Sequence, residues 1–246
     1  MKIALLGYGK MGKEIESIAN QRGHEVVVKF DKEEDWLADK AQLEGVDVAI
    51  EFTAPNSVVK NIFKCFDADV PVVVGTTGWM GQLDHVKEIC REHNKTLFYA
   101  SNFSIGVNLF FKMNEMLAKM MSDHEEYEVS IDETHHTEKL DAPSGTAIRL
   151  AEDVARNMER KDLWVKGDSS NNYEIGVHSH RIDKTPGTHV VKYKSEIDDL
   201  EIKHVAKSRV GFAKGAVLAA EWVNGRKGLY TMDDLLKDVN FAGFWQ

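Results

Sequence analysis

Residues 132–150, with the sequence DETHHTEKLDAPSGTAIRL, contain an unusual density of titratable side chains. Two adjacent imidazoles, at His135 and His136, are followed by the ammonium group of Lys139. Carboxylates lie at Asp132, Glu133 and Asp141. So many ionisable groups on one short stretch suggest proton-transfer chemistry.

The end of this stretch is typical of a helix start. Ser144, which follows Pro143, is a good N-cap, and Gly145 and Thr146 complete a small turn. An apolar helix face follows at Ile148, Leu150, Ala151, Val154 and Ala155. Because the first backbone N–H groups of a helix have no partner within it, they stabilise an anion.

These features also have ordinary structural explanations. Paired histidines occur on solvated loops, and Ser-Gly-Thr is common at helix starts. The combination of the pair with Lys139 and the turn, at this spacing, favours a functional site over those explanations.

The same residues resemble a family signature. The segment 133–146, ETHHTEKLDAPSGT, is similar to the pattern E-x-H-H-x-x-K-x-D-A-P-S-G-T of the 4-hydroxy-tetrahydrodipicolinate reductases, formerly called dihydrodipicolinate reductases. Those enzymes serve the diaminopimelate and lysine pathway. The resemblance implies reduction of 4-hydroxy-tetrahydrodipicolinate, a cyclic dicarboxylate, to tetrahydrodipicolinate, with a nicotinamide cofactor as hydride donor.

The resemblance also implies roles for individual residues. His135 stands at the family's acid/base position, and Lys139 at that of a second proton donor. The residues implied in binding the substrate carboxylates are His136, Lys139, Ser144, Gly145 and Thr146. The division of proton-transfer roles between His135 and Lys139 stays open.

Composition limits the other classes of function. The chain has 246 residues, of which 43% are hydrophobic, and a net charge of −9 that argues against general nucleic-acid binding. No apolar run approaches the roughly 20 residues of a membrane span. The chain enters a strand directly after Met1, without the pattern of a signal peptide, and its two cysteines, Cys65 and Cys90, lack metal-ligand spacing. We therefore expect a reduced, cytoplasmic protein without a metal site.

The first hundred residues alternate short β-branched runs with amphipathic stretches, which predicts a doubly wound parallel sheet of the Rossmann type. The expected strands are residues 3–6, 26–30, 46–52, 70–74 and 97–100. A ligand of such a sheet binds at the carboxyl ends of its strands.

The first strand end has the G-x-G-x-x-G pattern of dinucleotide sites, Gly7-Tyr8-Gly9-Lys10-Met11-Gly12. Gly7 permits the tight turn, Gly9 lets a diphosphate approach the backbone, and Gly12 lets the helix pack closely on the strand. The pattern alone is weak, because glycines can serve only a turn. Its place after a strand and before a helix, with an acidic residue at Asp31, favours dinucleotide binding.

Further strand ends are expected to contact the cofactor. Thr53 follows the third strand, and small residues there leave room for a ligand. The resemblance implies that the next two strand ends line the nicotinamide side of the cleft. Those residues are Gly75, Thr76, Thr77, Gly78, Ala100, Ser101, Asn102 and Phe103.

The choice of cofactor depends on the end of the second strand. The Asp31 carboxylate can accept hydrogen bonds from both ribose hydroxyls of NADH and would repel the 2′-phosphate of NADPH. The next residue, Lys32, acts in the opposite direction, although well-known family members have arginine there. We expect both cofactors to be used, with NADH preferred.

The second half of the chain predicts a substrate domain of the α+β class with a mixed sheet. A helix at 107–121 precedes strands at 127–132, 173–180, 189–194 and 200–206, and residues 161–172 are expected to form a loop or an edge element. A cluster of His178, Arg181, Lys184 and His189 resembles the family's sheet segment beside the substrate. The expected domains are 1–104, completed by 214–246, and 105–213. The final helices are expected at 215–223 and 232–240, and Thr231, with Asp234 three residues on, is the expected cap of the last one.

The resemblance implies a homotetramer joined through the substrate-domain sheets. Two alternative functions stay open. The chain could be another two-domain NAD-dependent dehydrogenase of a small dicarboxylate or amino acid, although such an enzyme has no reason to have the HH-x-x-K-x-DAPSGT loop. It could also be a non-catalytic NAD(H)-sensing regulator, but the sequence shows neither a partner surface nor a DNA-binding module.

Overall fold

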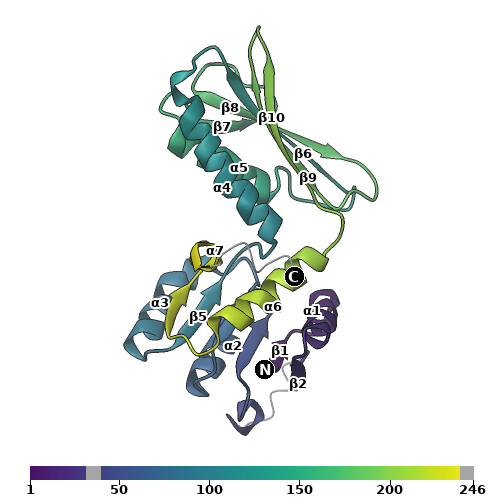
Figure 1. Cartoon of the computed structure of the whole chain (residues 1–246), viewed down its shortest axis with the longest axis vertical. Helices are drawn as coiled ribbons and strands as arrows, with labels where there is room; N and C mark the ends of the chain where they lie inside the picture. The colour runs from purple at the N-terminus through teal and green to yellow at the C-terminus, as the bar shows by residue number, and fades with distance from the viewer. Residues whose placement is uncertain (32–39, 239–246) are drawn as a thin grey trace. The chain divides into compact units, whose positions relative to one another are not determined.

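The computed structural model describes residues 1–31 and 40–238, which form two compact units (Figure 1). The first unit comprises Met1–Ile105 and Val210–Gln246, and the second comprises Gly106–Arg209. These divisions fall close to the predicted domain boundaries at residues 104 and 213.

The first unit is built on a six-stranded parallel sheet with the order β11-β5-β4-β3-β1-β2. Its strands are β1 (Lys2–Leu6), β2 (Glu25–Phe30), β3 (Val48–Glu51), β4 (Val72–Val74), β5 (Thr96–Tyr99) and β11 (Gly228–Tyr230). Its helices are α1 (Lys10–Gln21), α2 (Val58–Asp67), α3 (Leu83–Glu92), α6 (Val210–Val223) and α7 (Met232–Asp238), with short 3-10 helices at Lys40–Leu43 and Met80–Gln82. The predicted Rossmann-type sheet is confirmed.

Both faces of the sheet are buried along its four inner strands, β1, β3, β4 and β5. Ile3 and Leu5 of β1 pack with α1 and α6, whereas Ala4 and Leu6 pack with α2 and α3. Because successive side chains of a strand point to opposite faces, a strand covered on both sides must be apolar throughout. This is why the short apolar runs of the inner strands could be recognised in the sequence.

The chain returns to the first unit through α6, which begins earlier than the predicted start at residue 215. The short edge strand β11 pairs with β5 and was not predicted, because three residues offer too little pattern. The predicted cap of the last helix is confirmed: the backbone N–H and the hydroxyl of Thr231 both donate to Asp234 Oδ2 at 2.9 Å.

The second unit has a five-stranded mixed sheet with the order β10-β9-β6-β8-β7. Its elements are α4 (Ile105–Met120), β6 (Glu128–His135), α5 (Gly145–Asn157), β7 (Leu163–Lys166), β8 (Glu174–Arg181), β9 (Thr188–Lys194) and β10 (Asp199–Val205), with a 3-10 helix at Met121–Asp123. The pairs of β6 with β9 and of β9 with β10 are antiparallel, and those of β6 with β8 and of β8 with β7 are parallel. The predicted mixed sheet is confirmed, with an edge strand in the 161–172 segment.

The helices α4 and α5 lie along one face of this sheet and share an apolar core with it (Figure 1). The central strand β6 alternates in burial, so that Val129, Ile131, Glu133 and His135 face the helices. The strand continues to His135, beyond the predicted end at residue 132. As a result, a carboxylate and an imidazole extend a row that begins in the apolar core.

Candidate active site

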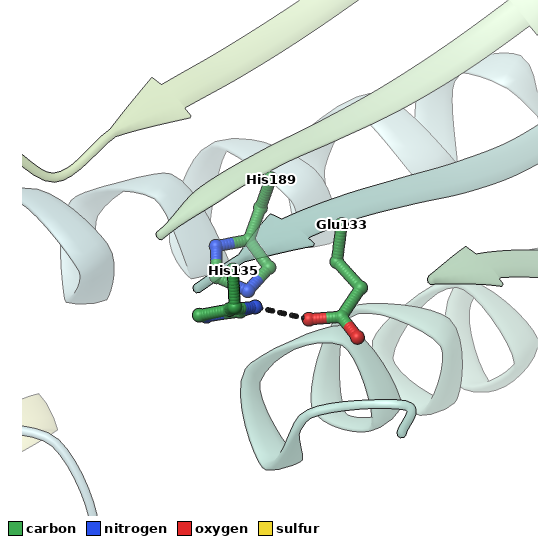
Figure 2. Close-up of side chains that lie close together, drawn as sticks. All are labelled: Glu133, His135 and His189. Atoms are coloured by element: carbon green, nitrogen blue, oxygen red, sulfur yellow. Dashed lines mark ion pairs between the residues drawn. The ribbon is translucent and has the colours of Figure 1, made fainter. Parts of the chain in front are cut away.

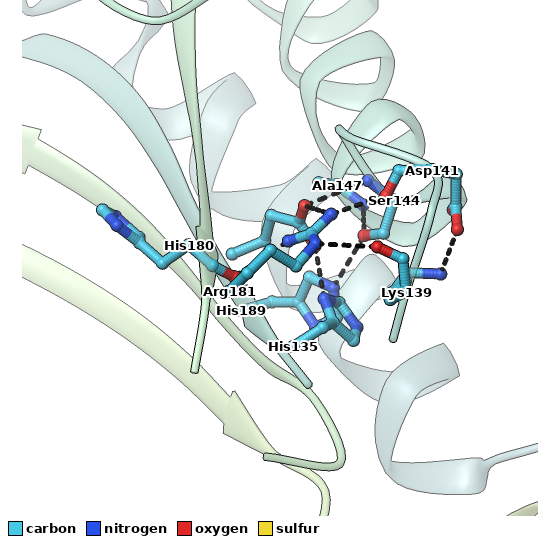
Figure 3. Close-up of polar contacts among 9 residues, drawn as sticks. His135, Lys139, Asp141, Ser144, Ala147, His180, Arg181 and His189 are labelled. Carbon is cyan, nitrogen blue, oxygen red and sulfur yellow. Dashed lines mark hydrogen bonds and ion pairs between the residues drawn. The ribbon is translucent and has the colours of Figure 1, made fainter. Parts of the chain in front are cut away.

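Three strands of the second unit bring polar side chains to one place near the start of α5 (Figure 3). Glu133 of β6 lies opposite His189 of β9 and Ser179 of β8, and His135 lies opposite Arg181. Paired residues on neighbouring strands project to the same face, so the register of β6 gathers these groups under the helix start.

A buried carboxylate lies directly beside the His135 ring. Glu133 Oε2 is 2.5 Å from His135 Nδ1, and the Glu133 side chain has no exposed surface (Figure 2). Glu133 Oε1 accepts hydrogen bonds from Arg181 Nη2 at 3.0 Å and from the backbone N–H of Ser144 at 3.2 Å. Burial by itself would raise the pKa of Glu133, but hydrogen bonds from His135, Ser179, Ser144 and Arg181 hold it well below its usual range.

This contact selects one tautomer of His135. An anionic oxygen next to Nδ1 favours a proton on Nδ1, which leaves Nε2 as the nitrogen that exchanges protons. A Cβ atom at Gly187 would lie 3.0 Å from Nε2, so glycine keeps this nitrogen clear. The arrangement is suited to an acid/base imidazole that is oriented by a carboxylate.

His189 is a second, neutral imidazole. Its ring centroid lies 5.0 Å from that of His135, and its Nε2 lies 3.2 Å from the hydroxyl of Ser144. Burial, assisted by the His135 imidazole, lowers the pKa of His189 to about 3. His189 therefore packs against the His135 ring and hydrogen-bonds to Ser144, and it does not carry a charge.

Replacing His189 with asparagine should flatten the loss of stability in acid. In the wild type, His189 is neutral in the folded state and becomes protonated in the unfolded state below about pH 6.5, so stability falls with pH between about 6.5 and 3. At pH 5, this difference in protonation lowers the free energy of unfolding by about 2 kcal/mol. Urea unfolding at pH 7 and pH 5 measures it, with His124→Asn, at an exposed histidine of the same unit, as control. If the free energy of unfolding of His189→Asn fell between pH 7 and pH 5 as steeply as that of the wild type, His189 would not be the buried neutral group described here.

The predicted ammonium group lies on the loop between β6 and α5. Lys139 Nζ contacts Asp141 Oδ1 at 2.8 Å, and the backbone N–H of Lys139 donates to the carbonyl of His136 at 3.1 Å. His136 and Lys139 are both partly exposed. The two side chains are thus placed on a tight turn next to the His135 site.

The start of α5 fits an anion. The Ser144 hydroxyl accepts from the backbone N–H of Ala147 at 3.3 Å, which confirms the predicted N-cap. Gly145 and Thr146 form the first turn, and a Cβ atom added at Gly145 would meet nothing within 4 Å. The helix start is therefore open to a ligand carboxylate.

The predicted cluster of His178, Arg181, Lys184 and His189 is divided in the structure. Arg181 and His189 join the site, whereas the His180 side chain points away from it (Figure 3). His178 contacts Asp168 at 2.9 Å, and His180 contacts Asp132 at 3.1 Å. Because side chains alternate along β8, neighbouring residues lie on opposite faces of the sheet. Lys184 lies in the following turn, with a backbone φ of 61°.

Glu133, His135 and His189 also form a donor set that could hold a metal ion, since their ligand atoms lie within 4.8 Å of one another. However, Glu133 already accepts from Arg181 and Ser144, and the guanidinium charge opposes a bound cation. We therefore interpret the group as a proton-handling site.

The first unit has a pocket of about 490 Å³ at the carboxyl ends of β1, β2 and β3, where the strand order reverses. Gly7, Gly9, Asp31 and Thr53, four of the residues expected to contact the cofactor, line it. Gly7 has a φ of 94°, and a Cβ atom there would lie 2.0 Å from the carbonyl oxygen of Phe52. A Cβ atom at Gly9 would meet nothing within 4 Å, so the backbone is open where a diphosphate would approach.

The other residues of the glycine motif surround this turn. The backbone N–H of Tyr8 donates to Asp31 Oδ1 at 3.1 Å, and a Cβ atom at Gly12 would lie 2.3 Å from the Gly7 carbonyl oxygen. Lys10 is exposed, and Met11 packs against the core. Lys32, predicted to assist NADPH, lies outside the described residues.

The strand ends predicted for the nicotinamide side differ in exposure. The Thr76 hydroxyl accepts from the backbone N–H of Thr53 at 2.7 Å and joins two strand ends, whereas the Phe103 side chain belongs to the core. Any contact of Phe103 with a ligand would therefore come from its backbone. The remaining residues are at least partly exposed: Gly75, Thr77, Gly78, Ala100, Ser101 and Asn102.

Comparison with known proteins finds matches along nearly the whole chain. Residues 1–103 match the family described as Dihydrodipicolinate reductase, N-terminus, and residues 106–236 match Dihydrodipicolinate reductase, C-terminus. The 4-hydroxy-tetrahydrodipicolinate reductase of Christiangramia forsetii is 47% identical over 97% of this chain and 99% of its own length. The enzyme of the same name from Methanosarcina barkeri is 36% identical over 96% of this chain and 99% of its own length.

A solved structure agrees with these matches. The dipicolinate-bound dihydrodipicolinate reductase from Paenisporosarcina sp. TG-14 has 25% sequence identity and a TM-score of 0.77. The alignment covers 94% of this chain and 97% of that one. Among the described residues of the present structure, the helices are too short or too polar to cross a bilayer.

Proposed function

The chain belongs to the dihydrodipicolinate reductase family, and we propose that it reduces 4-hydroxy-tetrahydrodipicolinate to tetrahydrodipicolinate with a nicotinamide cofactor, in diaminopimelate and lysine biosynthesis. The observation that carries the proposal is the His135 ring, held by Glu133 beside an open helix start. This arrangement joins a proton-handling group to a site for a carboxylate, as a cyclic dicarboxylate substrate requires.

In the second unit, some residues handle protons and others bind the substrate. When bound, the nicotinamide cofactor supplies a hydride, and loss of the substrate's 4-hydroxyl group as water consumes a proton. His135, whose Nε2 lies beside Gly187, is the acid/base residue, and Lys139 is the second proton donor. The substrate carboxylates bind to His136, Lys139 and the first turn of α5, formed by Ser144, Gly145 and Thr146.

The residues of the first unit bind the cofactor. Gly7 and Gly9 hold the diphosphate against the start of α1, and Asp31 and Thr53 lie on the adenosine side. The nicotinamide side is formed by the ends of β4 and β5, at residues 75–78 and 100–103.

A direct assay tests the activity. The purified protein is mixed with the condensation product of pyruvate and aspartate semialdehyde, and NADH oxidation is followed by absorbance. Rapid, substrate-dependent oxidation is expected. NADH binding without oxidation would favour the NAD(H)-sensing regulator. Turnover only with another small dicarboxylate or amino acid would favour the alternative dehydrogenase.

NADH is proposed as the preferred cofactor, with NADPH also used. Asp31 lines the pocket beside Gly7 and Gly9, so its carboxylate would meet a 2′-phosphate at close range. Repulsion of roughly 1 kcal/mol or more corresponds to a preference of about tenfold or better.

Changing Asp31→Ser should narrow or reverse this preference, mainly by lowering KM and Kd for NADPH. Fluorescence titration and kcat/KM with both cofactors at physiological salt measure the change. Asp67→Ser, at an exposed acid of α2 outside this pocket, is the matched control. A wild type that works clearly better with NADPH would show that Asp31 does not face the ribose.

The proposal extends to assembly and location. We expect a cytoplasmic homotetramer joined through the five-stranded sheets, whose edge and polar face would otherwise stay uncovered. Light scattering that reports a monomer at micromolar concentration would count against the tetramer.

A further inference from the structure

A single guanidinium group connects the two halves of the candidate site. Arg181 Nη2 donates to Glu133 Oε1 at 3.0 Å and to the carbonyl of Asp141 at 2.5 Å, and its Nε donates to the carbonyl of Lys139 at 3.3 Å. Its Nη1 donates to the carbonyl of His180 at 2.8 Å. The same side chain therefore binds the carboxylate beside His135 and the loop that bears Lys139.

Glu133 uses its two oxygens differently. Oε1 accepts from Arg181 and from the backbone N–H of Ser144, whereas Oε2 lies beside His135 Nδ1. Since both donors to Oε1 are fixed, by β8 and by the start of α5, the carboxylate cannot rotate away from His135 without losing them.

We propose that Glu133 and Arg181 are a positioning pair for the reaction: Glu133 sets the tautomer of His135, and Arg181 holds the Lys139 loop in register with that imidazole. Neither residue needs to touch the substrate in this role. The inference rests on the proposed function, because it concerns the two groups that handle protons there.

Holding the Lys139 loop requires the branched, planar guanidinium group of Arg181. The planar guanidinium reaches a carboxylate and three carbonyl oxygens in different directions, whereas a lysine ammonium is a compact charge on a flexible stem. Arg181→Lys should therefore keep the positive charge near Glu133 and release the loop carbonyls.

Glu133→Gln should invert the tautomer of His135. In the variant, Arg181 and Ser144 still require an acceptor, so the amide oxygen takes the place of Oε1 and the amide NH₂ faces His135. The NH₂ donates to Nδ1, which moves the imidazole proton to Nε2. Nε2, the nitrogen that exchanges protons in the wild type, then carries the ring proton. A wrong tautomer of this kind lowers kcat by about 100-fold or more.

The first experiment uses the full-length, cofactor-free protein labelled with ¹⁵N-histidine. Imidazole ¹⁵N shifts, assigned by comparison with His135→Asn, should report Nδ1–H in the wild type and Nε2–H in Glu133→Gln. Asp153→Asn, at another buried carboxylate that contacts arginines in the same unit, should leave the His135 pattern unchanged. An unchanged His135 pattern in Glu133→Gln would overturn the role of Glu133.

The second experiment measures hydrogen exchange and turnover in Arg181→Lys. Exchange of the backbone amides in residues 137–142 should rise by about tenfold, and kcat should fall by about tenfold with the Kd for NADH unchanged. Arg160→Lys is the control, because Arg160 also binds two carbonyl oxygens, those of His124 and Tyr127, away from the site. Normal exchange and normal kcat in Arg181→Lys would overturn the role of Arg181.

The two tests remain decisive if one variant is unstable. If circular dichroism shows that Glu133→Gln does not fold, the tautomer of His135 in the wild type still tests the role of Glu133. Arg181→Lys then tests the role of Arg181. A wild type that contains Nε2–H at His135 would itself overturn the inference. Absence of turnover in the wild type would instead refute the proposed function and leave the tautomer and exchange results as evidence on the geometry.

Discussion

His135→Ala is expected to lower kcat by about 10²- to 10⁴-fold, the usual contribution of a positioned acid/base group, while NADH still binds. The imidazole is almost fully buried, lies 2.5 Å from Glu133 and has its Nε2 beside a glycine that leaves the nitrogen clear. The neighbouring His189 cannot replace it, because burial lowers the pKa of His189 to about 3 and the Ser144 hydroxyl is its partner.

Steady-state turnover and the Kd for NADH, measured on the same preparation, separate chemistry from cofactor binding. His180→Ala is the matched control, since His180 lies one strand away but faces Asp132 on the opposite side of the sheet. Lys139→Ala should also lose most of kcat with NADH binding intact. Near wild-type turnover in either variant would remove that residue from the mechanism.

Gly7→Ala is expected to destabilise the first unit, whereas Gly9→Ala is expected to weaken cofactor binding. An alanine at position 7 would need a φ of 94° and place its Cβ 2.0 Å from the Phe52 carbonyl oxygen, so the first unit should lose about 3 kcal/mol or more of stability. At Gly9, φ is −76° and no atom lies within 4 Å of the added Cβ, so folding should be nearly normal. The methyl group would instead occupy the space of the diphosphate and raise the Kd for NADH by at least about tenfold.

Thermal unfolding and NADH titration together test this pair. Gly7→Ala should lower the melting temperature by about 10 °C, and Gly9→Ala should leave it within a few degrees, about the effect of a changed helix cap. If Gly9→Ala bound NADH as tightly as the wild type, the diphosphate would not lie against this turn.

Local patterns in the sequence predicted most of the fold. Strands β1, β3, β4 and β5 are buried on both faces, so they appear as continuous apolar runs, and the glycine motif follows the first of them. Ser144 and Thr231 were recognised as helix caps because a cap depends on residues within one turn of it. The edge strand β11 was missed, since its three residues are defined by pairing with β5 alone.

The candidate site was predicted only in part. The loop with His135 and Lys139 is contiguous in sequence, so its residue types and spacing could be recognised directly. The residues from β8 and β9 were grouped by composition, and that grouping wrongly placed His178 with Arg181. A stricter use of the two-residue period along β8 would have separated them.

The sequence by itself determined the alternation of strands and helices, the glycine turn, the helix start at Ser144 and the proton-handling loop, because each depends on residues close together in the chain. The tertiary structure alone decided that Glu133 faces His135, that His189 is buried and neutral, and that Arg181 reaches the loop. Glu133 and His135 share a face because they lie two residues apart on β6, which continues to His135. The positions of His189 and Arg181 beside them depend on the register of β6 with β8 and β9. A shift of one residue in that register would turn every one of these side chains to the other face, and nothing local to 132–150 specifies it.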